Sequence, residues 1–307
     1  MIRRSIFLAA LLLLAVRPAG AADPPIVVVS IKPLHGLASA VMAGVGAPQL
    51  LIPGGASPHR YSLKPSQARQ LAAARLVIRV GPALEGFLDR PLKTLAGQAR
   101  HLDLADAAGI THRRASAQLD GHGAHAHDHK HEHDDHDGRD MHLWLDPANA
   151  RAMAADIAAA LAEVDPANAA RYRRNGAELT ARLGDLDIEL ATTLRQLGGR
   201  PYIVFHDAYR HLESRYGLQN AGVIAVNPDR PPGAQRIREI RRRVTAGKIR
   251  CVFSEPQFPP RLGQTVTSGT EVRTAILDPI GAEIEPGPAA YFRIMRGLAA
   301  SFAACLS

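Results

Sequence analysis

Short apolar runs alternate with stretches rich in alanine and leucine between residues 26 and 80. The runs at 26–31, 50–52 and 76–80 are rich in Val, Ile and Leu and predict strands, whereas 34–43 and 66–74 predict helices. Strands that alternate with helices in this way favour a mostly parallel sheet flanked by helices. The first part of the chain is therefore expected to form an α/β lobe.

A long amphipathic helix is predicted between Asp165-Pro166, which suits a helix start, and Gly198-Gly199, which suits a helix end. Its apolar residues recur at intervals of three, four or seven and form one stripe: Tyr172, Leu179, Leu183, Leu186, Leu190, Leu194 and Leu197. A helix of about 32 residues would be about 48 Å long, which is more than one compact lobe needs. We therefore expect a rigid helix that joins two lobes.

Alternation of strands and helices resumes after this helix. Strands are predicted at 202–205, 223–226, 251–254 and 274–277, and a basic helix at 236–244, whose Arg241–Arg243 run is interpreted as a solvated face. Similar elements on both sides of the helix predict two similar α/β lobes with a cleft between them. The expected boundaries are residues 23–164 for the N-terminal lobe, 165–198 for the connecting helix and 199–307 for the C-terminal lobe.

The first 22 residues have the pattern of a secretory signal peptide. Arg3 and Arg4 precede a short apolar stretch at 6–16, and small residues follow at 19–22. Cleavage after Ala22 would leave a soluble periplasmic protein that is only peripheral to the membrane; the alternative is an uncleaved anchor. No apolar run reaches the roughly 20 residues that a membrane-spanning helix requires.

The net charge and the two cysteines bear on the partner of the protein, its compartment and the kind of metal site it can have. The chain has 37 Lys and Arg against 29 Asp and Glu, and three of the arginines lie in the leader, so the excess is mild and does not call for a nucleic-acid partner. Cys251 and Cys305 can form a disulfide in an oxidising compartment, although two buried free thiols remain an alternative. Neither has a neighbouring cysteine, so a cysteine-based zinc site is not expected.

Eight of the 14 histidines lie in one polar stretch, at about residues 112–140, which we interpret as a disordered loop because it contains almost nothing apolar; seven of the eight cluster between residues 122 and 136. These histidines alternate with acidic residues and form an auxiliary set of weak metal ligands: His122, His125, His127, His129, His131, His133 and His136. The hypothesis is a loop that collects zinc near the cleft. An inert insertion and a sensor of excess metal are the alternatives.

Four further side chains follow or end predicted strands, or stand where folded sequence resumes: His59, His142, His206 and Asp278. Open α/β sheets bind ligands at the ends of their strands. Three imidazoles with a carboxylate or a water satisfy the tetrahedral coordination of zinc. The sequence therefore predicts a metal site between the lobes.

Several longer motifs surround these residues, and through them the chain resembles the metal-binding (cluster A-I) solute-binding proteins of ABC importers, most closely the zinc-uptake branch. The motifs are Gly54–Lys64, Val80-Gly81-Pro82, Met141–Pro147, Phe205–Tyr209, Ser254–Gln257 and Leu277–Gly281. The resemblance covers about residues 26–305. It implies two α/β lobes, a rigid connecting helix and Zn(II) as a transported ligand, with no enzymatic activity. It also implies that the protein acts as a monomer and delivers the ion to a membrane permease whose ATPase drives import.

The resemblance assigns His59, His142 and His206 as zinc ligands and pairs Cys251 with Cys305. Manganese-binding members use an aspartate that matches Asp278 as fourth ligand, whereas in zinc-binding members a water often replaces it. Pro58 stands where some zinc-binding members carry a glutamate. Glu255 and Asp207 are candidate acceptors for the free ring nitrogens of the histidines.

Three other functions are weighed against zinc import. A manganese or iron importer of the same family would share the fold, but the histidine-rich loop favours zinc. A zinc-dependent hydrolase would need an open coordination position and a base, and neither a His-Glu-x-x-His nor a Gly-x-Ser-x-Gly motif is present. An adhesin would bind host surfaces and need no permease.

Overall fold

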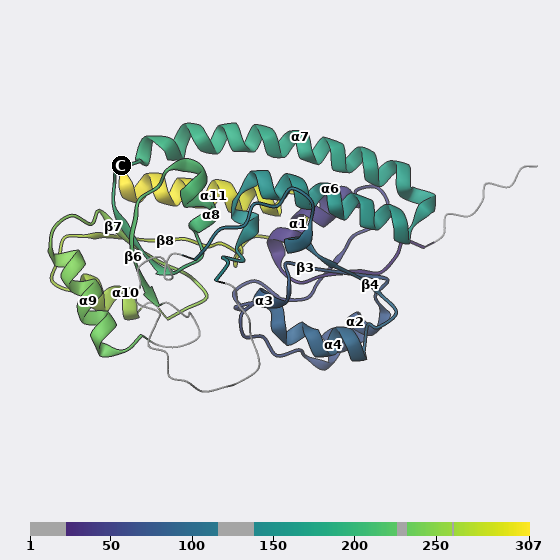
Figure 1. Ribbon diagram of the computed structural model, residues 1–307, viewed down its shortest axis with the longest axis horizontal. Coiled ribbons are helices and arrows are strands. Elements are labelled where there is room, and N and C mark those ends of the chain that lie inside the picture. The colour runs from purple at the N-terminus through teal and green to yellow at the C-terminus, as the bar shows by residue number, and fades with distance from the viewer. Residues whose placement is uncertain (1–22, 116–137, 226–231, 260) are drawn as a thin grey trace, which may run out of the picture.

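The computed structural model describes residues 23–115, 138–225, 232–259 and 261–307. It contains two four-stranded sheets, one formed before and one after the long helix in the chain, and both lie on the same side of that helix (Figure 1). All strand pairs within these sheets are parallel. The strand orders are β2-β1-β3-β4 and β6-β5-β7-β8. The two sheets therefore have the same topology. In each lobe, the strand that comes first in the chain, β1 or β5, is the second strand across the sheet.

The first lobe is built from short elements whose strands are buried on both faces. Val27 and Val29 of β1 face the main core, and Val28 faces a smaller core that Leu71 and Leu92 help to form. This alternation follows from the two-residue period of a strand. Its elements are β1 (Val27–Val29), α1 (Lys32–Val41), β2 (Gln49–Leu50), α2 (Pro65–Ala73), β3 (Leu76–Arg79), α3 (Pro82–Glu85), α4 (Asp89–Thr94), β4 (Arg100–Asp103) and α6 (Pro147–Val164).

The second lobe has the same construction. Tyr202 and Val204 of β5 face the main core, and Ile203 faces a smaller core beneath α9 that includes Ile240 and Val244. Its elements are β5 (Tyr202–His206), α8 (Arg210–Tyr216), β6 (Asn220–Ala225), α9 (Ala234–Thr245), β7 (Cys251–Ser254), α10 (Arg261–Thr267), β8 (Arg273–Ile276) and α11 (Ala290–Leu306).

The connecting helix is confirmed, with 3₁₀ turns at both ends. α7 spans Ala169–Leu194, between 3₁₀ turns at Pro166–Asn168 and Arg195–Leu197. All seven residues of the predicted apolar stripe are buried. They belong to the main core, which also includes residues of both sheets. One core thus runs through both lobes along α7, and the lobes are packed together instead of being linked by a free hinge.

Two further features bear on the expected location. Cys251, which opens β7, and Cys305, near the end of α11, form a disulfide with their Cα atoms 5.9 Å apart. Among the described residues, no helix is both long and apolar enough to cross a bilayer. The predicted signal peptide at 1–22 lies outside the described residues.

Candidate metal centre

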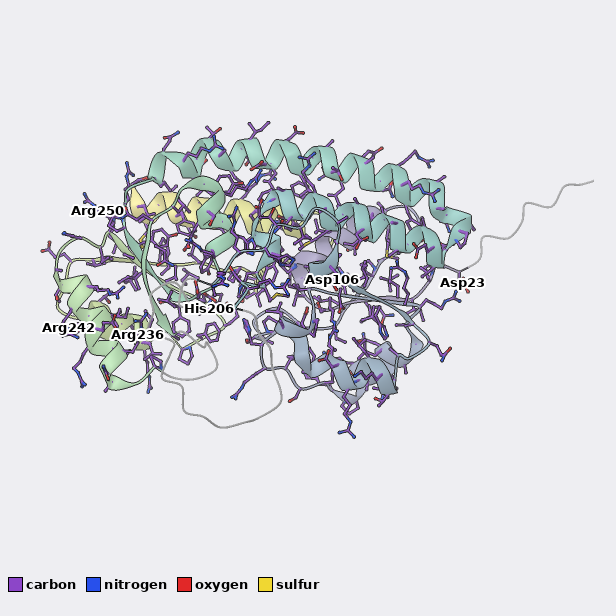
Figure 2. All side chains as sticks on the ribbon, in the orientation of Figure 1. Asp23, Asp106, His206, Arg236, Arg242 and Arg250 are labelled. Atoms are coloured by element: carbon purple, nitrogen blue, oxygen red, sulfur yellow. A yellow bond between two sulfur atoms is a disulfide. The ribbon has the colours of Figure 1, made fainter. Side chains whose placement is uncertain are left out.

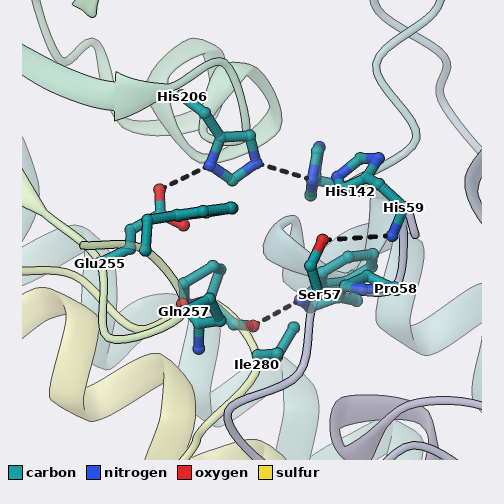
Figure 3. Close-up of a pocket in the computed structure, with 11 residues that line it drawn as sticks. Ser57, Pro58, His59, His142, His206, Glu255, Gln257 and Ile280 are labelled. Atoms are coloured by element: carbon teal, nitrogen blue, oxygen red, sulfur yellow. Dashed lines mark hydrogen bonds and ion pairs between the residues drawn. The ribbon is translucent and has the colours of Figure 1, made fainter. Parts of the chain in front are cut away.

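The structure brings together three histidines from both lobes. The β-ladder of the first lobe continues beyond β2 to Ile52, whose N–H donates to the Ser30 carbonyl, and the chain then turns to His59. His142 directly precedes a 3₁₀ turn at Leu143–Leu145 that leads into α6. His206 is the last residue of β5. Three separate segments therefore position the three rings (Figure 3).

The rings are close enough to share one ion. Their centroids are 5.4 Å apart for His59 and His142, 5.8 Å for His59 and His206, and 5.1 Å for His142 and His206. One nitrogen from each ring lies within 4.8 Å of the other two. The Nε2 atoms of His142 and His206 are 3.3 Å apart. A tetrahedral zinc with bonds of 2.0–2.1 Å holds its ligand nitrogens about 3.3 Å apart, so this spacing fits.

Two buried carboxylates fix the orientation of two of these rings. The Nδ1 of His142 is 2.6 Å from Oδ1 of Asp140. The Nδ1 of His206 is 2.7 Å from Oε1 of Glu255 (Figure 3), and this oxygen also accepts a hydrogen bond from the Tyr209 hydroxyl. A carboxylate accepts a hydrogen bond, so each Nδ1 carries the proton and each Nε2 presents its lone pair. With the protons on Nδ1, the two Nε2 atoms, 3.3 Å apart, can both bind one metal ion.

The ring of His59 also has a nitrogen that is free to bind a metal. The Nε2 of His59 is buried and has no hydrogen-bond partner. Burial, with smaller contributions from His142 and His206, holds the pKa of His59 well below its usual value of 6.5, so this ring is neutral and able to bind a metal. For His206, burial alone would lower the pKa, but the Glu255 carboxylate outweighs it and the pKa is raised.

Charge and surroundings suit a divalent ion. The three ligands are neutral when they bind a metal, and the carboxylates of Asp140 and Glu255 supply two compensating negative charges one bond further out. The walls of the pocket are largely apolar: Pro58, Trp144, Phe258, Pro279 and Ile280. Nitrogen ligands in an apolar shell fit zinc better than manganese, which prefers oxygen ligands.

Asp278 does not join this group of possible ligands. Its Oδ1 accepts hydrogen bonds from the side-chain amide of Gln257, at 2.9 Å, and from the N–H of Gly281, also at 2.9 Å, while its Oδ2 accepts from the N–H of Ala282. The carboxylate therefore closes the turn that follows β8. Its position at a strand end placed it near the site, but its hydrogen bonds direct it into this turn.

Sequence reasoning found one of the two carboxylates that orient the ligands. Glu255 was expected as an acceptor, and it directly follows β7, the neighbour of β5 in the sheet. Asp207 is buried, and its negative charge helps to raise the pKa of His206. Asp140 was missed because it ends the histidine-rich stretch. The spacing Asp-x-His was the available signal, because an aspartate often accepts from the N–H two residues on, as Asp140 does from His142 at 2.9 Å.

The seven histidines of the auxiliary set lie outside the described residues. The described flanks of this stretch are held together: Arg114 and Arg139 form an antiparallel bridge, and the N–H of Ala115 donates to the Gly138 carbonyl. Buried His211 contacts the Asp140 carbonyl through its Nε2, at 2.9 Å. The two ends of the stretch therefore meet beside His142.

Comparison with known proteins decides the family. Residues 27–305 match the family described as zinc-uptake complex component A, periplasmic. The high-affinity zinc uptake system protein ZnuA of Brucella suis biovar 1 (strain 1330) is 43% identical over 305 residues, which cover 92% of this chain and 91% of that protein. The chain belongs to the ZnuA family. Its members' crystal structures confirm the two-lobed fold predicted here.

Two ZnuA structures illustrate this similarity. A crystal structure of ZnuA matches with a TM-score of 0.78 at 26% identity and covers 93% of this chain and 100% of that chain. The structure of a ZnuA deletion mutant with zinc bound matches with a TM-score of 0.76 at 25% identity and covers 93% and 99% of the two chains.

Proposed function

We propose that this chain is the periplasmic solute-binding component of a high-affinity zinc ABC importer. It captures Zn(II) at His59, His142 and His206 and delivers the ion to a membrane permease, whose partner ATPase drives import. Membership of the ZnuA family makes the protein a binding component instead of an enzyme. The leader at 1–22 is removed on export, and the exported chain acts as a monomer.

One observation carries the proposal: one nitrogen from each of the three rings converges within 4.8 Å of the other two, and the Nε2 atoms of His142 and His206 are 3.3 Å apart. The carboxylates behind His142 and His206 fix this arrangement before any ion arrives. A preorganised set of three imidazoles loses little freedom on binding, which favours high affinity. A water is expected to complete the coordination, since Asp278 is engaged in its turn.

Isothermal titration of the metal-free exported chain tests this assignment. We expect one tight zinc site, and His142→Ala or His206→Ala should weaken it by at least about a hundredfold, because each removes a direct ligand. His101→Ala is the matched control, since His101 lies exposed on β4 and contacts the Ala96 carbonyl. Unchanged tight binding in both ligand variants would refute the site. Tighter binding of manganese than of zinc would favour the manganese importer.

A further inference from the structure

The positive charge of the exported chain is concentrated in two stretches, one in each lobe. Residues 60–94 and 234–250 together contain fourteen Lys and Arg and only three Asp and Glu. All other residues from 23 onward contain 20 Lys and Arg against 26 Asp and Glu. Each stretch is therefore strongly basic, whereas the remainder of the exported chain is mildly acidic.

Nine of the fourteen cations in these stretches form two groups. Some serve the fold: Arg79 is buried between Asp89 and Asp103, while Arg236 and Arg243 bind Glu239 and backbone carbonyls of β6. Others are exposed on helices, and none of these forms an ion pair with an acidic residue in the part of the chain that the structure describes. They form an N-lobe basic surface and a C-lobe basic surface: Arg69, Arg90 and Lys93 on α2 and α4, and Arg238, Arg241 and Arg242 on α9.

Both surfaces lie on helices that are remote from α7. Figure 1 shows α7 along the top of the molecule across both lobes, with α2 and α4 at the lower right and α9 at the lower left. His206 lies between these two regions in Figure 2, where Arg236 and Arg242 mark the C-lobe side. The two basic surfaces therefore flank the metal centre on the side of the molecule away from the connecting helix.

The chemistry of these surfaces indicates an anionic and extended partner. Protein interfaces usually have an apolar centre with aromatic side chains. Among the described residues, the exposed large apolar side chains are Ile26, Leu95, Ile188 and Ile276, and of these only Leu95, which caps the end of α4, stands beside a basic surface. Exposed cations on helices, with a single exposed leucine at the end of α4, match the attraction of a protein to anionic headgroups better than a protein interface.

We propose that the N-lobe and C-lobe basic surfaces dock the protein on the anionic phospholipid headgroups of a membrane. Contact at both lobes turns α7 away from the bilayer and brings the side with the metal centre toward the membrane that holds the permease. The attraction is electrostatic, so it weakens as salt shortens the Debye length. This inference goes beyond zinc capture and stands or falls independently of it.

Vesicle flotation of the exported chain tests the proposal. The probes are vesicles that contain phosphatidylglycerol and vesicles of phosphatidylcholine alone, each at low and at high salt. The variants are Arg90→Gln/Lys93→Gln, Arg238→Gln/Arg242→Gln and the four changes combined. The matched control is Arg173→Gln/Arg174→Gln, which removes two exposed cations from α7 on the opposite side. Zinc titration and thermal unfolding verify that each variant is folded.

The expected result is selective binding to the phosphatidylglycerol vesicles at low salt. Each cation near an anionic surface contributes roughly a fivefold factor, so the combined variant, which removes four cations, should lose about a hundredfold or more in partition coefficient. The control should stay within about twofold of the parent chain. Equal loss in the control, or no preference for phosphatidylglycerol, would overturn the proposal. Capture by a permease in neutral lipid that requires these cations, without binding to anionic vesicles, would assign the surfaces to a protein partner instead.

Discussion

The ligand histidines depend on neighbours that never touch the ion. Asp140 and Glu255 hold the Nδ1 protons of His142 and His206 and so determine which nitrogen is free. Both carboxylates are almost completely buried, at 3% exposure each, so their hydrogen bonds act in a medium of low polarity. The affinity of the centre is therefore expected to depend on these residues as well as on the imidazoles.

Removing either carboxylate should weaken zinc binding without abolishing it. We expect Asp140→Ala and Glu255→Ala each to lower the zinc affinity by about ten- to a hundredfold, the effect typical of groups that orient a ligand. Competition with a chelating dye measures this, and near-native thermal unfolding excludes a folding defect. Asp278→Asn keeps the acceptor that faces Gln257 and Gly281, and should change the affinity by less than about threefold. A larger loss in Asp278→Asn than in Asp140→Ala would restore Asp278 as a ligand.

Glu85 is a single buried carboxyl group that should make the stability of the fold depend on pH. It is fully buried, and burial raises its pKa to about 7, although hydrogen bonds from Ser30, Gly81 and Val80 oppose the rise. A carboxyl whose folded pKa is raised binds protons more tightly in the folded state. The free energy of unfolding should therefore fall as pH rises from about 4.5 to 7, by about 3 kcal/mol from this group.

Glu85→Gln should remove that part of the pH dependence. The amide keeps one carbonyl oxygen for the Gly81 N–H and can donate to the Ser30 hydroxyl, and it cannot ionise. The Val80 N–H loses its acceptor at either pH, so this loss does not alter the pH dependence. Denaturant unfolding of the metal-free chain at pH 5 and pH 8, values chosen to span the pKa of about 7, measures the difference between the parent and the variant. Glu213, with a pKa raised to about 8, contributes a slope of the same sign in both proteins. Parallel curves for parent and variant would contradict the assignment.

The sequence predicted the three histidines because each stands where a strand ends or where folded sequence resumes. That argument identifies which edge of a sheet a residue occupies but not where its side chain points. It could not predict that the Asp278 carboxylate accepts hydrogen bonds in the turn after β8. Asp140 was hidden for a different reason. The histidine-rich stretch has no pattern that marks where the folded chain resumes, so its last residue was assigned to the loop although it is buried.

At the scale of elements, the sequence predicted those helices and strands whose hydrophobic residues recur with a clear period. The strands β1, β3, β5 and β7 are confirmed with shifts of a few residues, and the stripe of α7 is buried as expected. No helix was predicted over Pro147–Val164, because its alanines pack against neighbours without forming a contrast between apolar and polar faces. Alanine fits both a core and a surface, so this pattern carries little information until the partner helix is known.

The contact between α6 and α7 gives a prediction with an internal control. A Cβ built on Gly176 of α7 would lie 2.7 Å from the Cβ of Ala158 in α6, which is closer than packed side chains approach. Gly176→Ala should gain helix propensity but force the helices apart, and should destabilise the protein by about 1–3 kcal/mol.

Gly184 is the matched position in the same helix. Nothing lies within 4 Å of a Cβ built there, so Gly184→Ala should stabilise the protein by about 0.5–1 kcal/mol. Thermal and denaturant unfolding compare the two variants under identical conditions. Stabilisation by both changes would mean that α6 and α7 do not approach each other as closely as described.

At the scale of the whole molecule, the continuous core explains how a shared site can be rigid. Because residues of both sheets and of α7 belong to one core, the three histidines are held by a single packed body. The two-lobed architecture was predictable from the repeated β/α texture and the long stripe. That the lobes share a core was not predictable, since sequence periodicity shows which face of an element is buried but not against what.

Because the packed core holds the three ligand histidines, the histidine-rich stretch is not expected to be needed for the fold or for the tight site. Its flanks are tied by hydrogen bonds from Ala115 to Gly138, at 2.9 Å, and from Asp140 to Arg113, at 2.8 Å. After residues 121–137 are deleted, residues 116–120 still connect Ala115 to Gly138, which are already hydrogen-bonded to each other. The fold and the metal centre should therefore be preserved. Calorimetry should then show the tight zinc site unchanged and several weak sites lost, since alternating imidazoles and carboxylates bind metal without fixed geometry. A deletion variant without a tight site would make the loop the primary ligand set and would remove His59, His142 and His206 from that role.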